Sequence, residues 1–220
     1  GIAGKQICRI GKTANEVLKM HRDRLESGID NMCVRTGIEE FDYVTGGLYK
    51  GELTVGAGRP GDGKTAVAMQ IAMNAALAGK HVCFFSLEMT ALQTMNRLFA
   101  GYGGVDANHL RIDGANPADL TKMEKMADEF QNLPLYFDHT SANSVENIRA
   151  QVMLQKRKNQ CDLAVVDYLH MMKVENHGKE TMDQMIGRNI QGLKQLALDA
   201  DIPILVLSQM NRNSVNRTDK

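Results

Sequence analysis

The 220-residue chain lacks an excess of charge of either sign, since 26 Lys and Arg residues balance 26 Asp and Glu residues. Proteins that bind nucleic acid over a broad outer face are usually basic, so the balance argues against such a surface. It leaves open nucleic acid held in a narrow channel. No apolar run approaches the roughly 18–20 residues that a membrane span needs, and residues 1–30 lack the pattern of a secretory signal. We therefore expect a cytoplasmic protein with no membrane contact.

Cysteine is scarce, and the chain contains no CxxC pair. The four cysteines are Cys8, Cys33, Cys83 and Cys161. Their wide spacing predicts reduced, buried thiols rather than disulfides. The six histidines show no metal-ligand spacing, and the sequence has neither an internal repeat nor a low-complexity tract. The sequence therefore gives no sign of a metal centre built from Cys and His.

The hydrophobic share of 43% and the charged share of 24% are ordinary for a globular domain, and the length suffices for one core with a small appendage. The chain starts at Gly1 rather than at Met, which suggests a piece of a longer protein. Residues 11–27 have the pattern of an amphipathic helix that needs a partner surface. Residues 28–50 are expected to be rich in loops.

From Glu52 onward, apolar runs alternate with helical patterns. The predicted strands are 53–55, 81–87, 135–137, 163–166 and 204–207. The predicted helices are 64–78, one that begins after Thr90, 117–131, 144–158 and 181–200. Helix caps are predicted at Thr90 with Gln93, Asn116 before Pro117, Ser144, and Thr181 with Gln184. This alternation predicts an α/β fold with a mostly parallel central sheet and helices on both faces.

One stretch between the first strand and the first of these helices fits the phosphate-loop pattern GxxxxGK[ST] at every fixed position. It reads Gly58, Arg59, Pro60, Gly61, Asp62, Gly63, Lys64 and Thr65. Glycines let successive N–H groups point at phosphates, and the helix start adds partial positive charge. Lys64 can reach the outer phosphates, and the Thr65 hydroxyl can ligate magnesium. The sequence predicts a nucleoside triphosphate site.

Polar residues follow the other strands, at the edge where ligands gather in open α/β sheets. Asp167 follows four apolar residues and is the predicted magnesium partner; Glu88 is the predicted base that activates a water, and Gln209 the predicted contact of the terminal phosphate. Each has an alternative: Glu88 suits the start of a helix, and Asp167 suits a strand-end cap. Asp138 also ends a strand, but local capping explains it equally well.

Together these motifs resemble the C-terminal, RecA-like motor domain of DnaB-type replicative DNA helicases. The resemblance runs from about Thr36 to Arg212. It is carried by Thr36-Gly37-Ile38, Thr45-Gly46-Gly47-Leu48, the phosphate loop, Phe84-Phe85-Ser86-Leu87-Glu88-Met89, Val166-Asp167-Tyr168-Leu169, and Ser208-Gln209-Met210-Asn211-Arg212. The Ser-Leu-Glu-Met and Asp-Tyr-Leu strings are more specific than the phosphate loop, which many unrelated ATPases share.

The resemblance implies a ring hexamer that hydrolyses ATP with Mg²⁺ at subunit interfaces and translocates on single-stranded DNA to unwind duplex. It gives Glu88, Asp167 and Gln209 the roles of catalytic glutamate, second-motif aspartate and phosphate sensor. It divides the chain into a linker-helix region at 1–30, which docks on a neighbouring subunit, and a RecA-like core at 31–220. Primase and a helicase loader are implied as partners through regions outside the chain.

Two features depart from the family pattern. His170 stands where the family usually has Gln. Members of the family also continue past the position of Lys220 into DNA-contacting backbone and an arginine finger. The resemblance therefore implies a core that is incomplete at its C-terminus, and neither Arg212 nor Arg217 is assigned as the finger.

Other functional classes share this fold. A recombinase of the RecA or RadA type would form an open filament on DNA, and a KaiC-like regulatory ATPase ring would ignore DNA. The Ser-Leu-Glu-Met and Asp-Tyr-Leu strings favour the helicase. Residues 173–180 are equally compatible with a DNA-contacting channel loop through Lys173 and Lys179 and with a solvated connection.

Overall fold

The computed structural model describes residues 9–27, 32–141, 143–167, 169, 172 and 181–209. Its centre is a five-stranded parallel sheet with the strand order β3-β7-β6-β4-β5. The strands are β3 (Leu53–Gly58), β4 (Val82–Ser86), β5 (Leu135–Asp138), β6 (Leu163–Asp167) and β7 (Ile204–Gln209). All five predicted strands are confirmed, and each begins within one residue of its predicted start.

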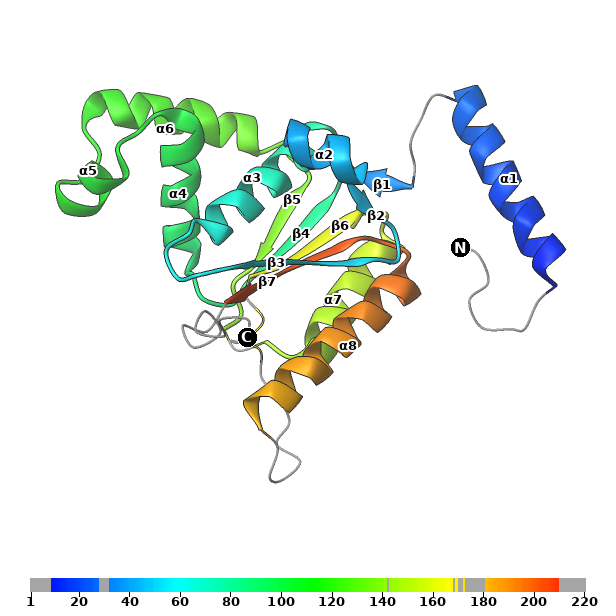
Figure 1. The fold of residues 1–220 in the computed structure, drawn as a ribbon. Coiled ribbons are helices and arrows are strands. Elements are labelled where there is room, and N and C mark those ends of the chain that lie inside the picture. Colours follow the sequence, from blue (N-terminus) through cyan, green and yellow to red (C-terminus); the bar gives the residue numbers. More distant parts are fainter. Residues whose placement is uncertain are drawn as a thin grey trace, which may run out of the picture.

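The sheet lies between two layers of helices, as predicted (Figure 1). On one face lie α3 (Lys64–Leu77) and α4 (Ala91–Gly103), and on the other lie α7 (Val145–Arg157) and α8 (Met182–Ala200). Every residue of β4 and β6 is buried. Because successive strand side chains point to opposite faces, Phe84 packs with α3, whereas Phe85 packs with α7 and α8. This explains the continuous apolar runs of the central strands.

The predicted helix caps are present in the structure. Capping boxes form at Thr90 with Gln93 and at Thr181 with Gln184, and a third joins Asn116 to Asp119. The Ser144 hydroxyl accepts a hydrogen bond from the N–H of Asn147 at the start of α7. Each such cap contributes about 0.5–2 kcal/mol, so these residues fix where the helices begin.

Residues 32–50 contain more regular structure than predicted, which corrects the expectation of a loop-rich stretch. β1 (Cys33–Val34) and β2 (Leu48–Tyr49) form a small antiparallel pair around α2 (Glu39–Thr45). A short helix, α5 (Ala107–Ile112), is also new. Two-residue strands and helices of six or seven residues are too short to show a hydrophobic period, which is why the sequence pattern misses them.

The Asp42 carboxylate organises the start of this region. It accepts hydrogen bonds of 2.9 Å from the N–H and the hydroxyl of Thr36 and from the N–H of Gly37. The Asn74 amide of α3 donates to the Thr36 carbonyl at 2.9 Å. Gly37 has φ +72°, and a Cβ there would lie 2.5 Å from Asn74 Nδ2. The Thr-Gly pair of the family pattern therefore fastens residues 36–42 to α3.

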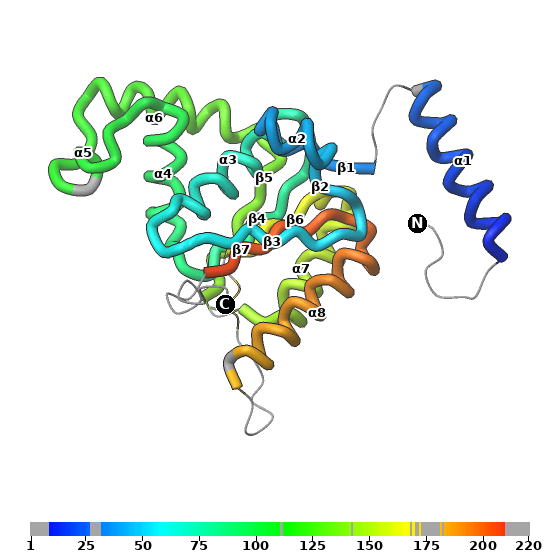
Figure 2. The backbone as a smooth tube through the Cα atoms, viewed as in Figure 1, coloured from blue at the N-terminus to red at the C-terminus, as the bar shows by residue number. Residues whose placement is uncertain are grey.

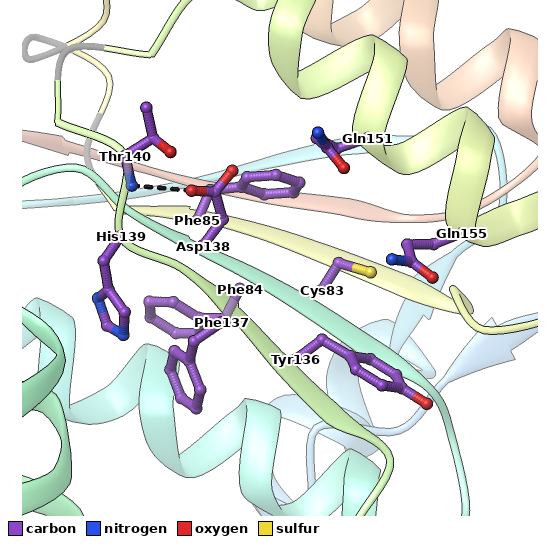
Figure 3. Close-up of a pocket in the computed structure, with 10 residues that line it drawn as sticks. All are labelled: Cys83, Phe84, Phe85, Tyr136, Phe137, Asp138, His139, Thr140, Gln151 and Gln155. Atoms are coloured by element: carbon purple, nitrogen blue, oxygen red, sulfur yellow. Dashed lines mark hydrogen bonds between the residues drawn. The ribbon is translucent and has the colours of Figure 1, made fainter.

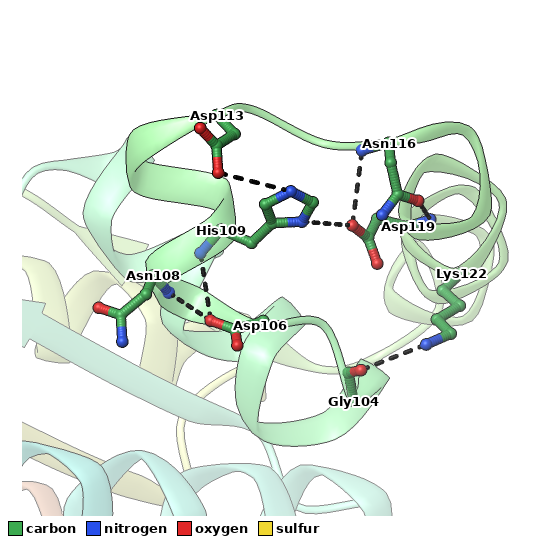
Figure 4. Close-up of polar contacts among 8 residues, drawn as sticks. All are labelled: Gly104, Asp106, Asn108, His109, Asp113, Asn116, Asp119 and Lys122. Carbon is green, nitrogen blue, oxygen red and sulfur yellow. Dashed lines mark hydrogen bonds and ion pairs between the residues drawn. The ribbon is translucent and has the colours of Figure 1, made fainter.

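Between β4 and β5 the chain makes a helical excursion through α4, α5 and α6 (Pro117–Phe130), which stands at one side of the sheet (Figure 2). Asp106 caps α5 by accepting from two backbone N–H groups, which lowers the pKa of its carboxyl. The His109 ring lies between Asp113 and Asp119, with N···O distances of 3.6 and 3.4 Å (Figure 4). Polar contacts thus join the end of α5 to the start of α6.

The first described helix, α1 (Ile10–Ser27), confirms the predicted amphipathic helix. It lies apart from the sheet in Figure 1. Its large apolar side chains at both ends are exposed, Ile10 by 88% and Leu25 by 84%. The boundary at residue 30 and the docking of this region on a neighbouring subunit stay predictions.

Three of the four cysteines, Cys33, Cys83 and Cys161, are buried thiols; Cys8 lies outside the described residues. Contact with the Cys83 thiol and burial raise the pKa of Cys161, so both behave as small apolar side chains. Within the described ranges, no helix is long and apolar enough to cross a membrane, and His, Cys, Asp and Glu form no group of three that could hold a metal ion.

Candidate nucleotide site

The phosphate-loop motif lies between β3 and α3, as predicted. The carboxylate of Asp62 accepts a hydrogen bond of 2.7 Å from the Arg59 N–H, and the Lys64 ammonium donates to the Arg59 carbonyl at 2.6 Å. Gly63 precedes α3 with φ +81°, a left-handed conformation that glycine adopts without strain. The loop is therefore closed by its own side chains, directly before the start of the helix.

The carboxyl ends of the neighbouring strands bring the other predicted residues to this loop. In the sheet register, Gly58 pairs with Gln209 and Ser86 pairs with Asp167. A cavity of about 280 Å³ lies at this edge. It is lined by Pro60, Gly61, Gly63, Lys64, Thr65, Glu88, Arg97, Asp167 and Gln209. All three predicted strand-end residues thus share one cavity with the loop.

The remaining loop residues lie elsewhere. Gly58 and Asp62 line a neighbouring, mostly apolar cavity of about 310 Å³ between α2, β3 and α3, and Arg59 lines neither cavity. A Cβ at Gly58 would lie 3.2 Å from Cγ of Lys64. Glycine at this position therefore leaves room for the lysine stem.

Arg97 of α4 is the residue of this cavity that the sequence analysis missed. Sequence reasoning considered the ends of strands, whereas Arg97 reaches the site from a helix face. One signal was present: Arg97 is the only charged residue between Glu88 and Asp106. This lone cation stands nearly two turns after a helix start that follows Glu88, so its position in the sequence is compatible with a place beside the site.

Asp167 is the most buried ionisable group of the cavity, with 2% of its surface exposed. Burial raises the pKa of its carboxyl above the ordinary value, and the negative charge of Glu88 adds to the rise. A hydrogen bond from the Thr65 hydroxyl and the positive charges of Arg97 and Lys64 lower the pKa without cancelling the effect of burial. Oδ2 of Asp167 has no hydrogen-bond partner among the described residues.

Because the pKa of Asp167 is higher in the folded protein than in the unfolded chain, the folded state binds the proton more tightly. Stability is therefore lost as the pH rises from the unfolded pKa, about 4, through the raised folded pKa. At neutral pH, above the unfolded pKa, this buried carboxyl group therefore costs free energy of folding. Such a cost is expected where a buried group is kept for function.

We predict that Asp167→Asn raises the free energy of unfolding at pH 7 by about 1 kcal/mol, or roughly 2–4 °C in Tm. The gain should vanish below about pH 4, where the aspartate is protonated in both states. Thermal melts at the two pH values, without nucleotide or divalent cation, measure it. Asp128→Asn, at an exposed position of α6, is the matched control. A less stable Asp167→Asn protein at pH 7 would contradict the prediction.

Thr65 and Asp167 fit the needs of Mg²⁺. Magnesium usually takes one or two protein oxygens and completes its shell with phosphate oxygens and waters. The Thr65 hydroxyl and the buried Asp167 carboxylate, which share a hydrogen bond, supply such oxygens. Oδ2 of Asp167 lacks a hydrogen-bond partner among the described residues.

Several residues of the sequence analysis lie outside the described residues. They are Tyr168, His170, residues 173–180 with Lys173 and Lys179, Met210, Asn211, Arg212 and Arg217. The interpretation of 173–180 as a channel loop or a solvated connection therefore stays a prediction with two alternatives.

Comparison with known proteins identifies the family. The chain matches the family model of the DnaB-like helicase C-terminal domain over residues 33–220. This chain belongs to that family. Replicative DNA helicase DnaB of Geobacillus stearothermophilus is 34% identical over 188 residues, which are 85% of this chain and 41% of the relative. Replicative DNA helicase DnaB of Pasteurella multocida is 35% identical over 222 residues, 98% of this chain and 47% of the relative.

Solved structures agree with the fold of this DnaB-like domain. One solved ATPase domain superposes with a TM-score of 0.81 and 27% identity, over 93% of this chain and 74% of that one. The structure of a DnaB-like replicative helicase, described with its interactions with primase, superposes with a TM-score of 0.79 and 27% identity. The match covers 97% of this chain and 51% of that one. The RecA-like α/β fold is thus confirmed. The chain spans less than half the length of the curated relatives named above.

Proposed function

We propose that this DnaB-like chain is the motor domain of a replicative DNA helicase, which hydrolyses ATP with Mg²⁺ to translocate on single-stranded DNA and unwind duplex. The observation that carries the proposal is the cavity at the carboxyl edge of the sheet. It joins the phosphate loop to a carboxylate on each of two neighbouring strand ends, Glu88 and Asp167, and to an amide, Gln209. Phosphate binding, metal binding and water activation each find a suitable group there.

On this proposal, the loop N–H groups and the start of α3 bind the phosphates, and the Lys64 ammonium balances the charge of the outer two. Thr65 and Asp167 hold Mg²⁺. When bound, Mg²⁺ would supply positive charge that offsets the negative charge of the phosphates. The Oδ2 atom of Asp167, which lacks a partner among the described residues, supports its assignment to a cation.

The exposed carboxylate of Glu88 accepts the proton of the attacking water. Gln209, which can both donate and accept, contacts the terminal phosphate and responds to its loss. Arg97 adds a positive charge on the side of α4, where it stabilises negative charge on the reacting phosphate oxygens.

The proposal includes an assembly of identical subunits, a ring hexamer, with single-stranded DNA in its channel and with primase and a helicase loader as partners. The curated relatives are named replicative helicases, and one structural neighbour was described with its primase interactions. The balanced charge of the chain suits DNA held by a few channel loops better than DNA bound over an outer face.

We expect single-stranded DNA to stimulate ATP turnover by the protein in its full natural length, and forked duplex to be unwound when ATP and Mg²⁺ are both present. Steady-state turnover with and without DNA, followed by a fork-unwinding assay, measures both. Sedimentation with and without ATP should show a hexamer. Turnover that ignores DNA would indicate a KaiC-like ATPase. Strand exchange without fork unwinding, on an open filament, would indicate a recombinase.

A further inference from the structure

The turn from Ser86 to Met89 holds Glu88 at the site through its backbone. Leu87 and Met89 are buried, with 3% and 9% of their surface exposed, whereas the Glu88 side chain between them is exposed. Among the described residues, no hydrogen bond holds the Glu88 carboxylate itself. Its position therefore depends on what anchors the two neighbouring residues.

The turn is anchored on both sides of Glu88. Before it, the Leu87 N–H donates to the Asp167 carbonyl at 2.7 Å, which ties the end of β4 to the end of β6. After it, the Met89 carbonyl has two partners: the Ser86 hydroxyl donates to it at 3.3 Å, and Nδ1 of His139 lies 3.1 Å from it. The Ser86 contact is internal to the turn. His139 supplies the contact with the rest of the fold.

His139 is itself held in place. It is the residue after β5, and its ring stacks on Phe137 with a centroid distance of 5.7 Å and an interplanar angle of 5° (Figure 3). The next N–H, of Thr140, donates to Oδ1 of Asp138 at 2.8 Å and fixes the course of the chain. His139 therefore connects a rigid strand end to the turn that carries Glu88.

The contact also defines the proton on the ring. A carbonyl oxygen only accepts hydrogen bonds, so the Nδ1 atom of His139 must carry hydrogen to bond Met89. Both the Nδ1–H tautomer and the imidazolium meet this condition. The Nε2–H tautomer would place two acceptors opposite each other and would break the contact.

We propose that His139 is a positioning residue for ATP hydrolysis, which holds Glu88 in its reactive place through the Nδ1–H···O=C bond to Met89. The inference rests on the proposed function of Glu88 as the base. His139 lines a different cavity, of about 360 Å³ beside β5, and does not line the nucleotide cavity. Loss of the His139 side chain should therefore slow the chemical step of ATP hydrolysis and leave nucleotide binding unchanged.

We expect His139→Ala to lower kcat about 10- to 100-fold, the usual cost of a small misplacement of a reacting group, with the KM for ATP within about twofold. His139→Asn should restore most of the turnover, because the Asn amide nitrogen occupies the place of Nδ1. His139→Gln should not, because its amide lies where Nε2 was. Thr140→Ala removes only an exposed neighbouring hydroxyl and is the matched control.

The measurement is ATP turnover at saturating DNA in the protein of full natural length, with nucleotide affinity and thermal stability recorded for each variant. Unchanged kcat in His139→Ala, or an Asn variant no better than Gln, overturns the inference. Should the variants fail to fold, the ¹⁵N shifts of His139 in the unaltered protein decide: the Nδ1–H form supports the inference, and the Nε2–H tautomer overturns it.

Glu88→Gln separates this inference from the function on which it rests. If Glu88→Gln retains turnover, Glu88 is not the base and the proposed mechanism fails. If Glu88→Gln abolishes turnover while His139→Ala leaves it intact, only the positioning role fails.

Discussion

Replacing Glu88 with glutamine is expected to reduce ATP turnover by about 10²- to 10⁴-fold, the usual contribution of a general base. The amide has the size of the carboxylate but takes no proton from water. Glu88 is exposed at the cavity and makes no hydrogen bond within the described residues, so the substitution should not disturb the fold. Single-turnover hydrolysis together with equilibrium binding of ATP gives both quantities.

The affinity for ATP should stay within a few-fold, because the phosphate loop and the Thr65–Asp167 pair are intact. Glu40→Gln, which alters an exposed carboxylate of α2, is the control and should hydrolyse ATP at the unaltered rate. Turnover in Glu88→Gln within tenfold of the unaltered protein would assign the base elsewhere.

Lys64→Ala is expected to lower kcat by about 10²–10³-fold, the cost of removing one group that stabilises charge in a transition state. It should also weaken ATP binding, since the ammonium faces the outer phosphates in the bound ground state as well. In the structure this ammonium lies 2.6 Å from the Arg59 carbonyl, so the loop already holds it at the cavity. Titration with a fluorescent nucleotide and steady-state kinetics measure the two effects.

Lys80→Ala, just beyond the far end of α3, removes a positive charge from the same region of the chain and serves as the control. Normal affinity in Lys64→Ala would show that the loop binds phosphate through its backbone alone. Glu88→Gln and Lys64→Ala should thus affect different steps. Glu88→Gln separates binding from chemistry, whereas Lys64→Ala damages both.

The parts of the site that were predictable from the sequence depend on local chemistry. The phosphate loop is one continuous stretch, and its fixed spacing between a strand and a helix identifies it. Glu88, Asp167 and Gln209 follow because parallel strands bring their carboxyl ends to one edge of the sheet. Their meeting in one cavity is confirmed, while their chemical roles stay predictions.

Arg97 and His139 could not be placed in the same way. The direction in which Arg97 points depends on how α4 packs against the sheet, which no spacing in the sequence specifies. His139 bonds a carbonyl 50 positions away in the chain. Such contacts depend on tertiary geometry, and a backbone carbonyl as partner leaves no trace in residue types.

The small elements at residues 33–49 were missed for a related reason. α2 has no buried residue and no side-chain cap at its first position. The chain at its start is held by hydrogen bonds that Thr36 and Gly37 donate to the Asp42 carboxylate. The bonds of one carboxylate, rather than a repeating pattern, decide the conformation there.

The Asn74–Thr36 hydrogen bond has a mechanical consequence. Thr36 lies two residues after the end of β1, and Asn74 is ten residues after Lys64 on one continuous helix, about 15 Å along its axis. A force applied to the chain before Cys33 therefore acts on a segment that is hydrogen-bonded to α3. The force passes through β1 and this hydrogen bond into helix α3, which begins with Lys64 and Thr65. A pull on the N-terminal segment would thus be transmitted to two residues that line the nucleotide cavity.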